Sequence, residues 1–219
     1  MQGSPETHAL ILAGPVSKAV VAQKELLRAG RRLVCLAAAW TVAQALEWRP
    51  DVVLGHLAEI PTSIRLDWQQ RGTQFILLPS AYEYSELEFA LNFTITTGAR
   101  DILLLGLLSS RLAERLSRLF LLARPEWGAA KIAFVHGQER GYVLRHGESV
   151  SLQVTPQDRI TLIPLSPTVT EITVRGAAPL LRGATLEFGT TQELVPVERP
   201  VQVWIGAGRL LLIHEHPLS

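Results

Sequence analysis

The first half of the chain alternates short, continuous apolar runs with longer segments of helical pattern. The runs span residues 10–13, 33–37, 52–54, 75–78, 102–105 and 131–135. A strand that is buried on both faces of a sheet is apolar throughout, whereas a half-exposed strand alternates apolar and polar residues. The pattern therefore predicts an α/β N-terminal domain, with a mainly parallel sheet and helices on both faces.

The pattern changes after about residue 138. Short segments such as residues 150–154 and 201–205 alternate apolar and polar side chains, and Gly, Pro and Asp separate them at short intervals. Closely spaced short strands of this kind are typical of an all-β sandwich or barrel. We expect an α/β domain over residues 1–138 and a small all-β sandwich domain over residues 139–219.

Composition excludes several classes of protein. The chain has 219 residues, of which 47% are hydrophobic and 19% charged, and its formal net charge is +1. These values are unlike those of disordered tails, which have few apolar residues, and of general nucleic-acid binders, which usually carry a basic face. No run approaches the roughly 18 apolar residues of a membrane span, and residues 1–8 do not resemble a secretion signal. We expect a cytoplasmic protein without nucleic-acid or membrane partners.

A single cysteine and a pair of histidines are the isolated reactive residues that need an interpretation. Cys35 lies within the apolar residues 33–36, which favours a small buried hydrophobe over a reactive thiol. His214 and His216 flank Glu215, and two histidines at this spacing share one face of a strand. The spacing suits a metal, but a frayed polar tail is the favoured interpretation this close to residue 219.

Four stretches carry a resemblance, and they occur in a fixed order along the chain. They are residues 49–55 (Arg-Pro-Asp-Val-Val-Leu-Gly), 82–91 (Tyr-Glu-Tyr-Ser-Glu-Leu-Glu-Phe-Ala-Leu), 105–122 and 160–180. In this order they resemble the motifs of the thiamin pyrophosphokinase family, whose members transfer a pyrophosphoryl group from ATP to thiamin. The resemblance implies an α/β domain followed by a β sandwich. It also implies a homodimer with thiamin in the cleft between subunits.

The carboxylates that the family places after its strands are mostly replaced here. The family's Asp-Phe-Asp-Ser reads His-Leu-Ala-Glu at residues 56–59, and its Asp-Gly-Gly falls near the alanines of residues 37–39. Its Gly-Gly-Arg-x-Asp-His falls on residues 109–114, where the arginine is kept as Arg111 and the aspartate has become Ala113. Because Mg²⁺ takes oxygen ligands and phosphoryl transfer depends on neutralising phosphate charge, these losses predict impaired or altered chemistry.

One acidic stretch is altered but not lost. The family's Lys-Asp-x-Thr-Asp-x-Glu reads Tyr-Glu-Tyr-Ser-Glu-Leu-Glu at residues 82–88. If the protein is active, the resemblance implies catalytic roles for Ser85, Glu86 and Arg111, with Glu83, Glu86 and Glu59 holding Mg²⁺. The alternative is a solvated acidic first turn, which the helix dipole favours without any metal.

Two further groups of residues are candidates for ligand binding. Free N–H groups of Ser109 and Ser110 at a helix start, with Arg111, could bind a phosphate; the alternative is a capped helix with a surface arginine.

In the β domain, Trp204 could stack on a flat ring, although packing inside the sandwich is the simpler interpretation. The family's Ser-Asn pair near its thiamin site corresponds to Thr191 and Gln192, which can still form hydrogen bonds.

Three functions remain open at this point. The first is a repurposed relative that keeps the dimer and a pocket for a nucleotide or a thiamin-like molecule, without a cofactor. The second is an active thiamin pyrophosphokinase that uses ATP and Mg²⁺ in a rearranged site. The third is an assembly or regulatory module without enzymatic activity.

Overall fold

The computed structural model describes residues 8–79, 85–108 and 111–216. The chain forms two compact units, Met1–Gly137 and Gln138–Ser219. The sequence predicted a boundary between residues 138 and 139.

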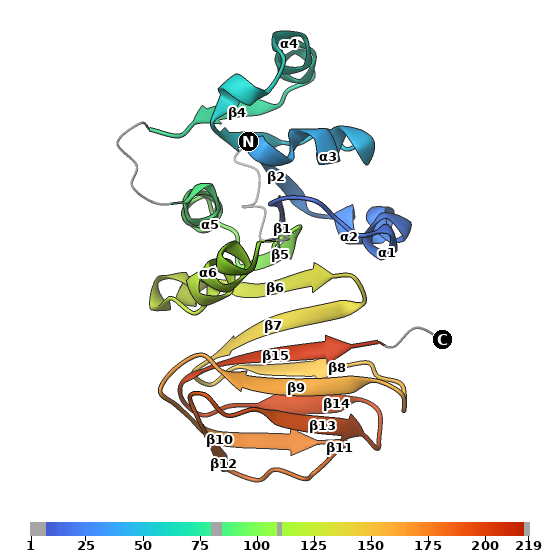
Figure 1. Ribbon diagram of the computed structural model, residues 1–219, viewed down its shortest axis with the longest axis vertical. Helices are drawn as coiled ribbons and strands as arrows, with labels where there is room; N and C mark the ends of the chain where they lie inside the picture. Colours follow the sequence, from blue (N-terminus) through green and yellow to red (C-terminus); the bar gives the residue numbers. More distant parts are fainter. Residues whose placement is uncertain (1–7, 80–84, 109–110, 217–219) are drawn as a thin grey trace, which may run out of the picture. The chain divides into compact units, whose positions relative to one another are not determined.

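Within its described residues, the first unit contains six strands that pair in parallel in the order β6-β5-β1-β2-β3-β4 (Figure 1). Their bounds are β1 (His8–Leu12), β2 (Arg32–Leu36), β3 (Val52–Gly55), β4 (Gln74–Leu77), β5 (Asp101–Leu105) and β6 (Lys131–His136). Side chains of the central strands, such as Leu10, Leu33 and Val53, are fully buried. Complete burial explains why these strands are continuous apolar runs, and the predicted parallel sheet is confirmed.

Helices connect the strands of this unit. They are α1 (Lys18–Ala22), α2 (Lys24–Arg28), α3 (Trp40–Ala45), α4 (Thr62–Gln70), α5 (Glu86–Thr96) and α6 (Leu112–Leu122), with short 3-10 helices η1 (Ala37–Ala39), η2 (Leu57–Glu59) and η3 (Pro125–Ala129). Serine caps begin two of the helices. The Ser17 hydroxyl accepts a hydrogen bond from the Val20 N–H, and the Ser85 hydroxyl accepts one from the Glu88 N–H. These bonds satisfy N–H groups that have no partner inside the helix.

The strand order reverses at β1. The chain runs from β1 to β2, β3 and β4 on one side, and β5 and β6 then add to the other side. Because crossovers in such sheets are right-handed, we expect the helices before and after the reversal to lie on opposite faces of the sheet. Helices on both faces therefore remain a prediction. Ligands of open α/β sheets bind beside the carboxyl ends of the strands at this kind of switch point.

Two glycines allow the loops after β1 and β5 to meet at the switch point. Gly106 has a φ of +66°, and a Cβ atom there would lie 2.1 Å from the carbonyl oxygen of Gly14. A side chain at residue 106 is therefore excluded both by the backbone conformation and by the neighbouring loop.

The second unit consists of antiparallel strands in two sheets, ordered β11-β13-β9-β15-β7 and β12-β10-β14-β8. Their bounds are β7 (Glu139–Arg145), β8 (Ser149–Leu152), β9 (Arg159–Pro164), β10 (Thr168–Arg175), β11 (Ala177–Ala178), β12 (Ala184–Glu187), β13 (Gln192–Pro196), β14 (Val201–Trp204) and β15 (Arg209–Glu215). Leu162, Leu210 and Leu212 of the first sheet share one buried cluster with Ile172 and Val203 of the second. The alternating sequence pattern arises because each strand turns one side to this cluster.

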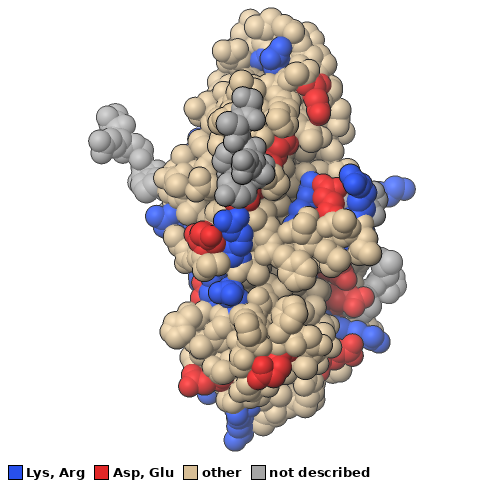
Figure 2. Space-filling view, turned by 60° about the vertical axis from the view of Figure 1, so that its left-hand side comes forward, with Lys and Arg blue, Asp and Glu red and all other residues tan. Residues whose placement is uncertain are grey.

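Acidic and basic side chains lie close to one another on the face of the molecule that Figure 2 shows. Mixing of this kind agrees with the nearly equal numbers of basic and acidic residues, 21 and 20. In the described part of the chain, no helix has the length and apolar character that a membrane crossing requires.

Candidate functional site

A cavity of about 580 Å³ lies in the first unit at the switch point, where β1 and β2 end and α5 begins. Its lining residues are Ala13, Leu36, Ala38, Ser85, Glu86, Leu87, Glu88, Glu114, Ser117, Arg118 and Leu121. The volume falls within the range of about 300–1,000 Å³ that is usual for small-molecule sites. Apolar walls with a few convergent polar groups are also typical of such sites.

Glu86, a predicted metal ligand and catalytic residue, lines this cavity. Its Oε1 atom accepts a hydrogen bond of 2.8 Å from the His56 N–H, just after β3. Gly55 makes this approach possible, since a Cβ atom at that position would lie only 2.3 Å from Oε1. Glu86 is therefore held by the backbone at the end of β3.

The other two described carboxylates of the cavity form ion pairs with arginines. Glu88 is buried and pairs with Arg124. Glu114 pairs with Arg118 at 2.5 Å. The second Nη atom of Arg118 also donates to the carbonyl oxygens of Gly106 and Leu107, at 3.3 and 3.0 Å. This arginine joins the start of α6 to the loop after β5.

The described residues bring three carboxylates to the cavity, those of Glu86, Glu88 and Glu114. Mg²⁺ needs several oxygen ligands in octahedral geometry, and a guanidinium group offers donors only. Each described carboxylate of the cavity already accepts a hydrogen bond or an ion pair from the protein. His56, Ala58 and Ala113, which the sequence resemblance aligns with carboxylates of the family, supply no carboxylate.

Several residues that the sequence grouped as one site are absent from the lining of this cavity or lie outside the described residues. Glu59 is exposed on η2 and does not line the cavity that contains Glu86. Arg111 is exposed at the residue before α6 and is likewise absent from the cavity lining. Glu83, Ser109 and Ser110 lie outside the described residues.

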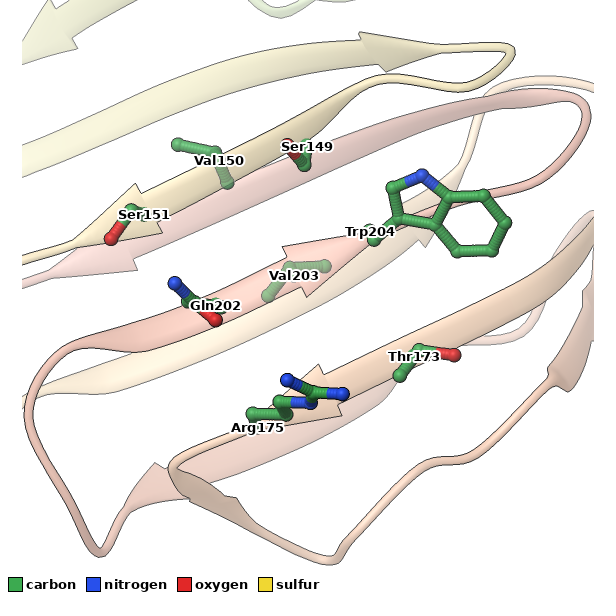
Figure 3. A pocket seen from close by; sticks show the side chains of 8 residues that line it. All are labelled: Ser149, Val150, Ser151, Thr173, Arg175, Gln202, Val203 and Trp204. Atoms are coloured by element: carbon green, nitrogen blue, oxygen red, sulfur yellow. The ribbon is translucent and has the colours of Figure 1, made fainter.

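Trp204 lines a second hollow, of about 420 Å³, in the β unit (Figure 3). The hollow lies over β8, β14 and β10, where two rows of cross-strand neighbours lie side by side: Ser149, Trp204 and Thr173, and Ser151, Gln202 and Arg175. Trp204 is 38% exposed, while its neighbour Val203 packs in the core. Trp204 thus lies on the outer side of its sheet, and the interpretation as a residue inside the sandwich is wrong.

The hydrogen-bonding pair Thr191 and Gln192 lies elsewhere. Gln192 begins β13, which belongs to the other sheet of the unit, and its side-chain amide donates to the carbonyl oxygen of Glu193 at 2.8 Å. Neither residue lines the hollow at Trp204. The structure therefore does not bring these three predicted ligand-binding residues into one pocket.

A third group consists of Asp158, His214 and His216, and sequence reasoning missed its acidic member. His214 is buried in β15, so the expectation of a frayed tail is wrong for it. Burial alone would raise the pKa of Asp158, but hydrogen bonds from Thr155, His214 and His216 outweigh it and keep the pKa below its usual range. Burial lowers the pKa of His214 more than its bond to Asp158 raises it. The only sign of this group in the sequence was the spacing of His214 and His216, which suits a metal.

Cys35 is fully buried in β2, as predicted. Burial, and to a lesser extent the charge of Glu86, raises the pKa of its thiol. A thiol of this kind is protonated at neutral pH and chemically inert.

Comparison with known proteins places this architecture among solved structures. No protein-family model matches the chain, and no curated protein sequence matches it. The structure of thiamine pyrophosphokinase from Bacillus subtilis is similar at a TM-score of 0.80 and 16% identity, covering 96% of this chain and 100% of that one. The structure of thiamin pyrophosphokinase from Geobacillus thermodenitrificans is similar at a TM-score of 0.78 and 18% identity, covering 96% of this chain and 98% of that one.

A eukaryotic structure gives the same result. Thiamin pyrophosphokinase from Candida albicans matches with a TM-score of 0.73 and 11% identity, covering 97% of this chain and 90% of that one. The similarity extends over both units rather than over the α/β unit alone. The chain therefore has the thiamin pyrophosphokinase fold, as the order of its sequence motifs predicted.

Proposed function

We propose that this protein is a repurposed thiamin pyrophosphokinase-like protein that binds a small ligand and does not transfer pyrophosphate at enzymatic rates. One observation carries the proposal: every described carboxylate in the switch-point cavity is engaged by a donor of the protein itself. The remaining positions where the family has carboxylates hold His56, Ala58 and Ala113.

Charge is the reason why these replacements matter. Pyrophosphoryl transfer moves negative charge onto leaving and attacking oxygens, and cations held by the protein neutralise that charge. Electrostatic stabilisation of this kind is often the largest contribution to catalysis. Among the described carboxylates, Glu88 and Glu114 are paired with arginines, which weakens their hold on a cation, so we expect the rate to fall by orders of magnitude.

A ligand pocket is nevertheless compatible with the cavity. Ser85 and Ser117 offer hydroxyl groups, and Leu36, Leu87 and Leu121 offer an apolar wall. A nucleotide or a thiamin-like molecule combines a flat ring with polar substituents and suits such a lining. Ser109, Ser110 and Arg111 stay as the proposed phosphate contacts of this ligand.

The proposal includes a homodimer. Large apolar side chains are exposed on the β unit, among them Leu180, Phe188, Val195 and Val197. A second copy of the chain would remove such side chains from water, which favours association. Light scattering during size-exclusion chromatography tests this part, and a monomer at micromolar concentration would contradict it.

A ligand screen tests the binding function. The melting temperature is measured with ATP, thiamin and thiamin diphosphate in turn, each with and without Mg²⁺. We expect at least one compound to raise the melting temperature in proportion to the logarithm of its concentration, without any need for Mg²⁺, because ligands that bind the native state stabilise it by mass action.

Two variants locate the binding site. Ser117→Trp fills the switch-point cavity from the surface of α6 and should abolish the shift. Trp204→Ala opens the hollow of the β unit and should leave the shift unchanged. A shift that Trp204→Ala abolishes would move the ligand to the β unit. No shift with any compound would favour the assembly module instead.

The second candidate is an active thiamin pyrophosphokinase. It is favoured by the position of Ser85 and Glu86, which both line the cavity as the resemblance requires. In this alternative, Glu83, Glu86 and Glu59 hold Mg²⁺ and Arg111 binds phosphate. A ligand shift that appears only with Mg²⁺ and is lost in Glu83→Gln would support it.

A further inference from the structure

The cluster of Asp158, His214 and His216 lies within the β unit, away from the residues that the proposed function uses. His214 and His216 are two residues apart at the end of β15, so their side chains share one face of the strand. Asp158 belongs to the turn that precedes β9, the strand that pairs with β15. Antiparallel pairing of these strands brings together residues that are 56 positions apart in the sequence.

All three side chains converge on one point. The distance from the Asp158 Oδ2 atom is 2.8 Å to His214 Nε2 and 3.0 Å to His216 Nδ1. The ligand-type atoms of the three residues all lie within 4.8 Å of one another. Among the described residues, no other three His, Cys, Asp or Glu side chains meet in this way.

Thr155 fixes the carboxylate in this position. Its hydroxyl donates to Asp158 Oδ1 at 2.6 Å, and its backbone N–H donates to Oδ2 at 2.9 Å. Carboxylates that bind a metal are commonly oriented by hydrogen bonds from a neighbouring residue that is not itself a ligand. The arrangement therefore provides both the ligand atoms and the residue that holds one of them in place.

The separation of the atoms is close to what a transition metal requires. Tetrahedral zinc, with bonds of about 2.0–2.1 Å, places its ligand atoms about 3.3 Å apart. The two contacts at Asp158 Oδ2 need to lengthen by only a few tenths of an ångström to admit an ion. The side chains of Asp158 and His214 are 1% and 3% exposed, and that of His216 is 39% exposed, which leaves a route for an ion from solvent.

We propose that Asp158, His214 and His216 form a binding site for a divalent transition-metal ion of the zinc class. Two imidazole nitrogens and one carboxylate oxygen are a ligand set that suits zinc rather than magnesium or calcium. With the ion on His214 Nε2 and His216 Nδ1, the proton of each neutral ring occupies its other nitrogen. Three protein ligands leave a position for water on the exposed side of His216.

One neighbouring charge opposes the ion. Arg140 on β7 lies opposite His214 in the pairing with β15. The carboxylate of Asp158 offsets the guanidinium charge, since it is held ionised by its hydrogen bonds. The site therefore remains able to accept a cation, and its expected role is to fasten the end of β15 to the turn before β9.

The test uses the full-length chain, without an affinity tag and stripped of metal by a chelator. Zn²⁺ binding is measured by calorimetry, and Co²⁺ is added in parallel because its visible absorption reports four-coordinate geometry. We expect one ion per chain and the absorption of four-coordinate Co²⁺. His216→Gln should weaken binding by at least about tenfold, whereas His146→Gln, at an exposed histidine of the same unit, should not.

Thr155→Val gives an independent test, because it removes the hydroxyl that orients Asp158 without changing a ligand. It should weaken Zn²⁺ binding by about tenfold and leave the stoichiometry at one ion. Circular dichroism of each variant without metal verifies that the β unit is folded. Absence of Zn²⁺ binding by the unaltered chain would overturn the proposal, as would equal affinity in His216→Gln.

Discussion

The switch-point cavity and the Asp158 cluster both hold ionisable side chains, yet the partners of their carboxylates differ in kind. In the cavity, Glu88 and Glu114 face guanidinium groups, and Glu86 faces a backbone N–H. In the β unit, Asp158 faces two imidazoles. A guanidinium group and a backbone N–H can only donate, whereas a neutral imidazole can offer one nitrogen to a metal.

The difference shows that counting carboxylates is not enough to recognise a metal site. The cavity is rich in acidic residues, but its arginines already supply the positive charge that an ion would bring. The cluster has only one acid, but two of the partners of that acid are imidazoles, which are themselves potential ligands. Whether a cation can bind at a carboxylate therefore depends on the chemical nature of the groups that already contact that carboxylate.

The largest expected effect concerns the backbone that forms the cavity. Gly106→Ala places a Cβ atom 2.1 Å from the Gly14 carbonyl oxygen at a φ of +66°. Conformational strain and the forced shift of the loop should together lower the free energy of unfolding by about 4 kcal/mol, measured by urea denaturation.

Gly30→Ala is the matched control. Gly30 has nearly the same φ, +67°, and a Cβ atom there meets nothing within 4 Å. Its cost should be about 1 kcal/mol, from the backbone conformation alone. Equal costs at the two glycines would mean that the close approach of the loops does not hold the cavity together.

The next effect tests the buried cluster. Asp158→Ala leaves the buried ring of His214 without its partner. We expect a loss of about 3 kcal/mol in the free energy of unfolding without metal, because buried polar groups that lose a partner are costly. Thermal and chemical unfolding measure it, and a loss below about 1 kcal/mol would contradict the contribution assigned to the cluster.

A smaller effect tests how Glu86 is held. Gly55→Ala forces Glu86 away from the His56 N–H and adds strain at a φ of +128°, with an expected cost of about 2 kcal/mol. In a Glu86→Ala background the collision with Glu86 disappears and only the tight contact with Ala37 Cβ at 3.1 Å remains, so the same substitution should cost less. A double-mutant cycle measures the difference, and perfect additivity would show that the two residues do not interact.

The smallest effect concerns an ion pair of the cavity. Glu114→Gln removes one charge of the pair with Arg118, whose partners at Gly106 and Leu107 remain. Since Glu114 is partly exposed, the expected cost is about 0.5 kcal/mol in urea denaturation. A cost as large as that of Asp158→Ala would remove the distinction between the two regions.

The fold was predictable because burial leaves a pattern in the sequence. Strands β1, β2 and β3 are covered on both faces and are continuous apolar runs, while β14 alternates, with Val201 and Val203 inside and Gln202 and Trp204 outside. These patterns depend on local spacing alone.

The pairing of side chains was not predictable in this way. Asp158 meets His214 only because of the register between β9 and β15. Glu88 meets Arg124, which follows α6, through tertiary packing that no local spacing records. Sequence reasoning therefore identified acidic residues as metal ligands without their partners, and it missed Asp158, which lies beside two imidazoles.

Formation of thiamin diphosphate and AMP from thiamin, ATP and Mg²⁺ tests the central claim most directly. Because the described carboxylates of the cavity are engaged by the protein, we predict product at the rate seen without protein, both for the natural chain and for Glu86→Ala. Turnover of about 1 s⁻¹ or faster, in the range of ordinary enzymes, that Glu86→Ala abolishes would contradict the account.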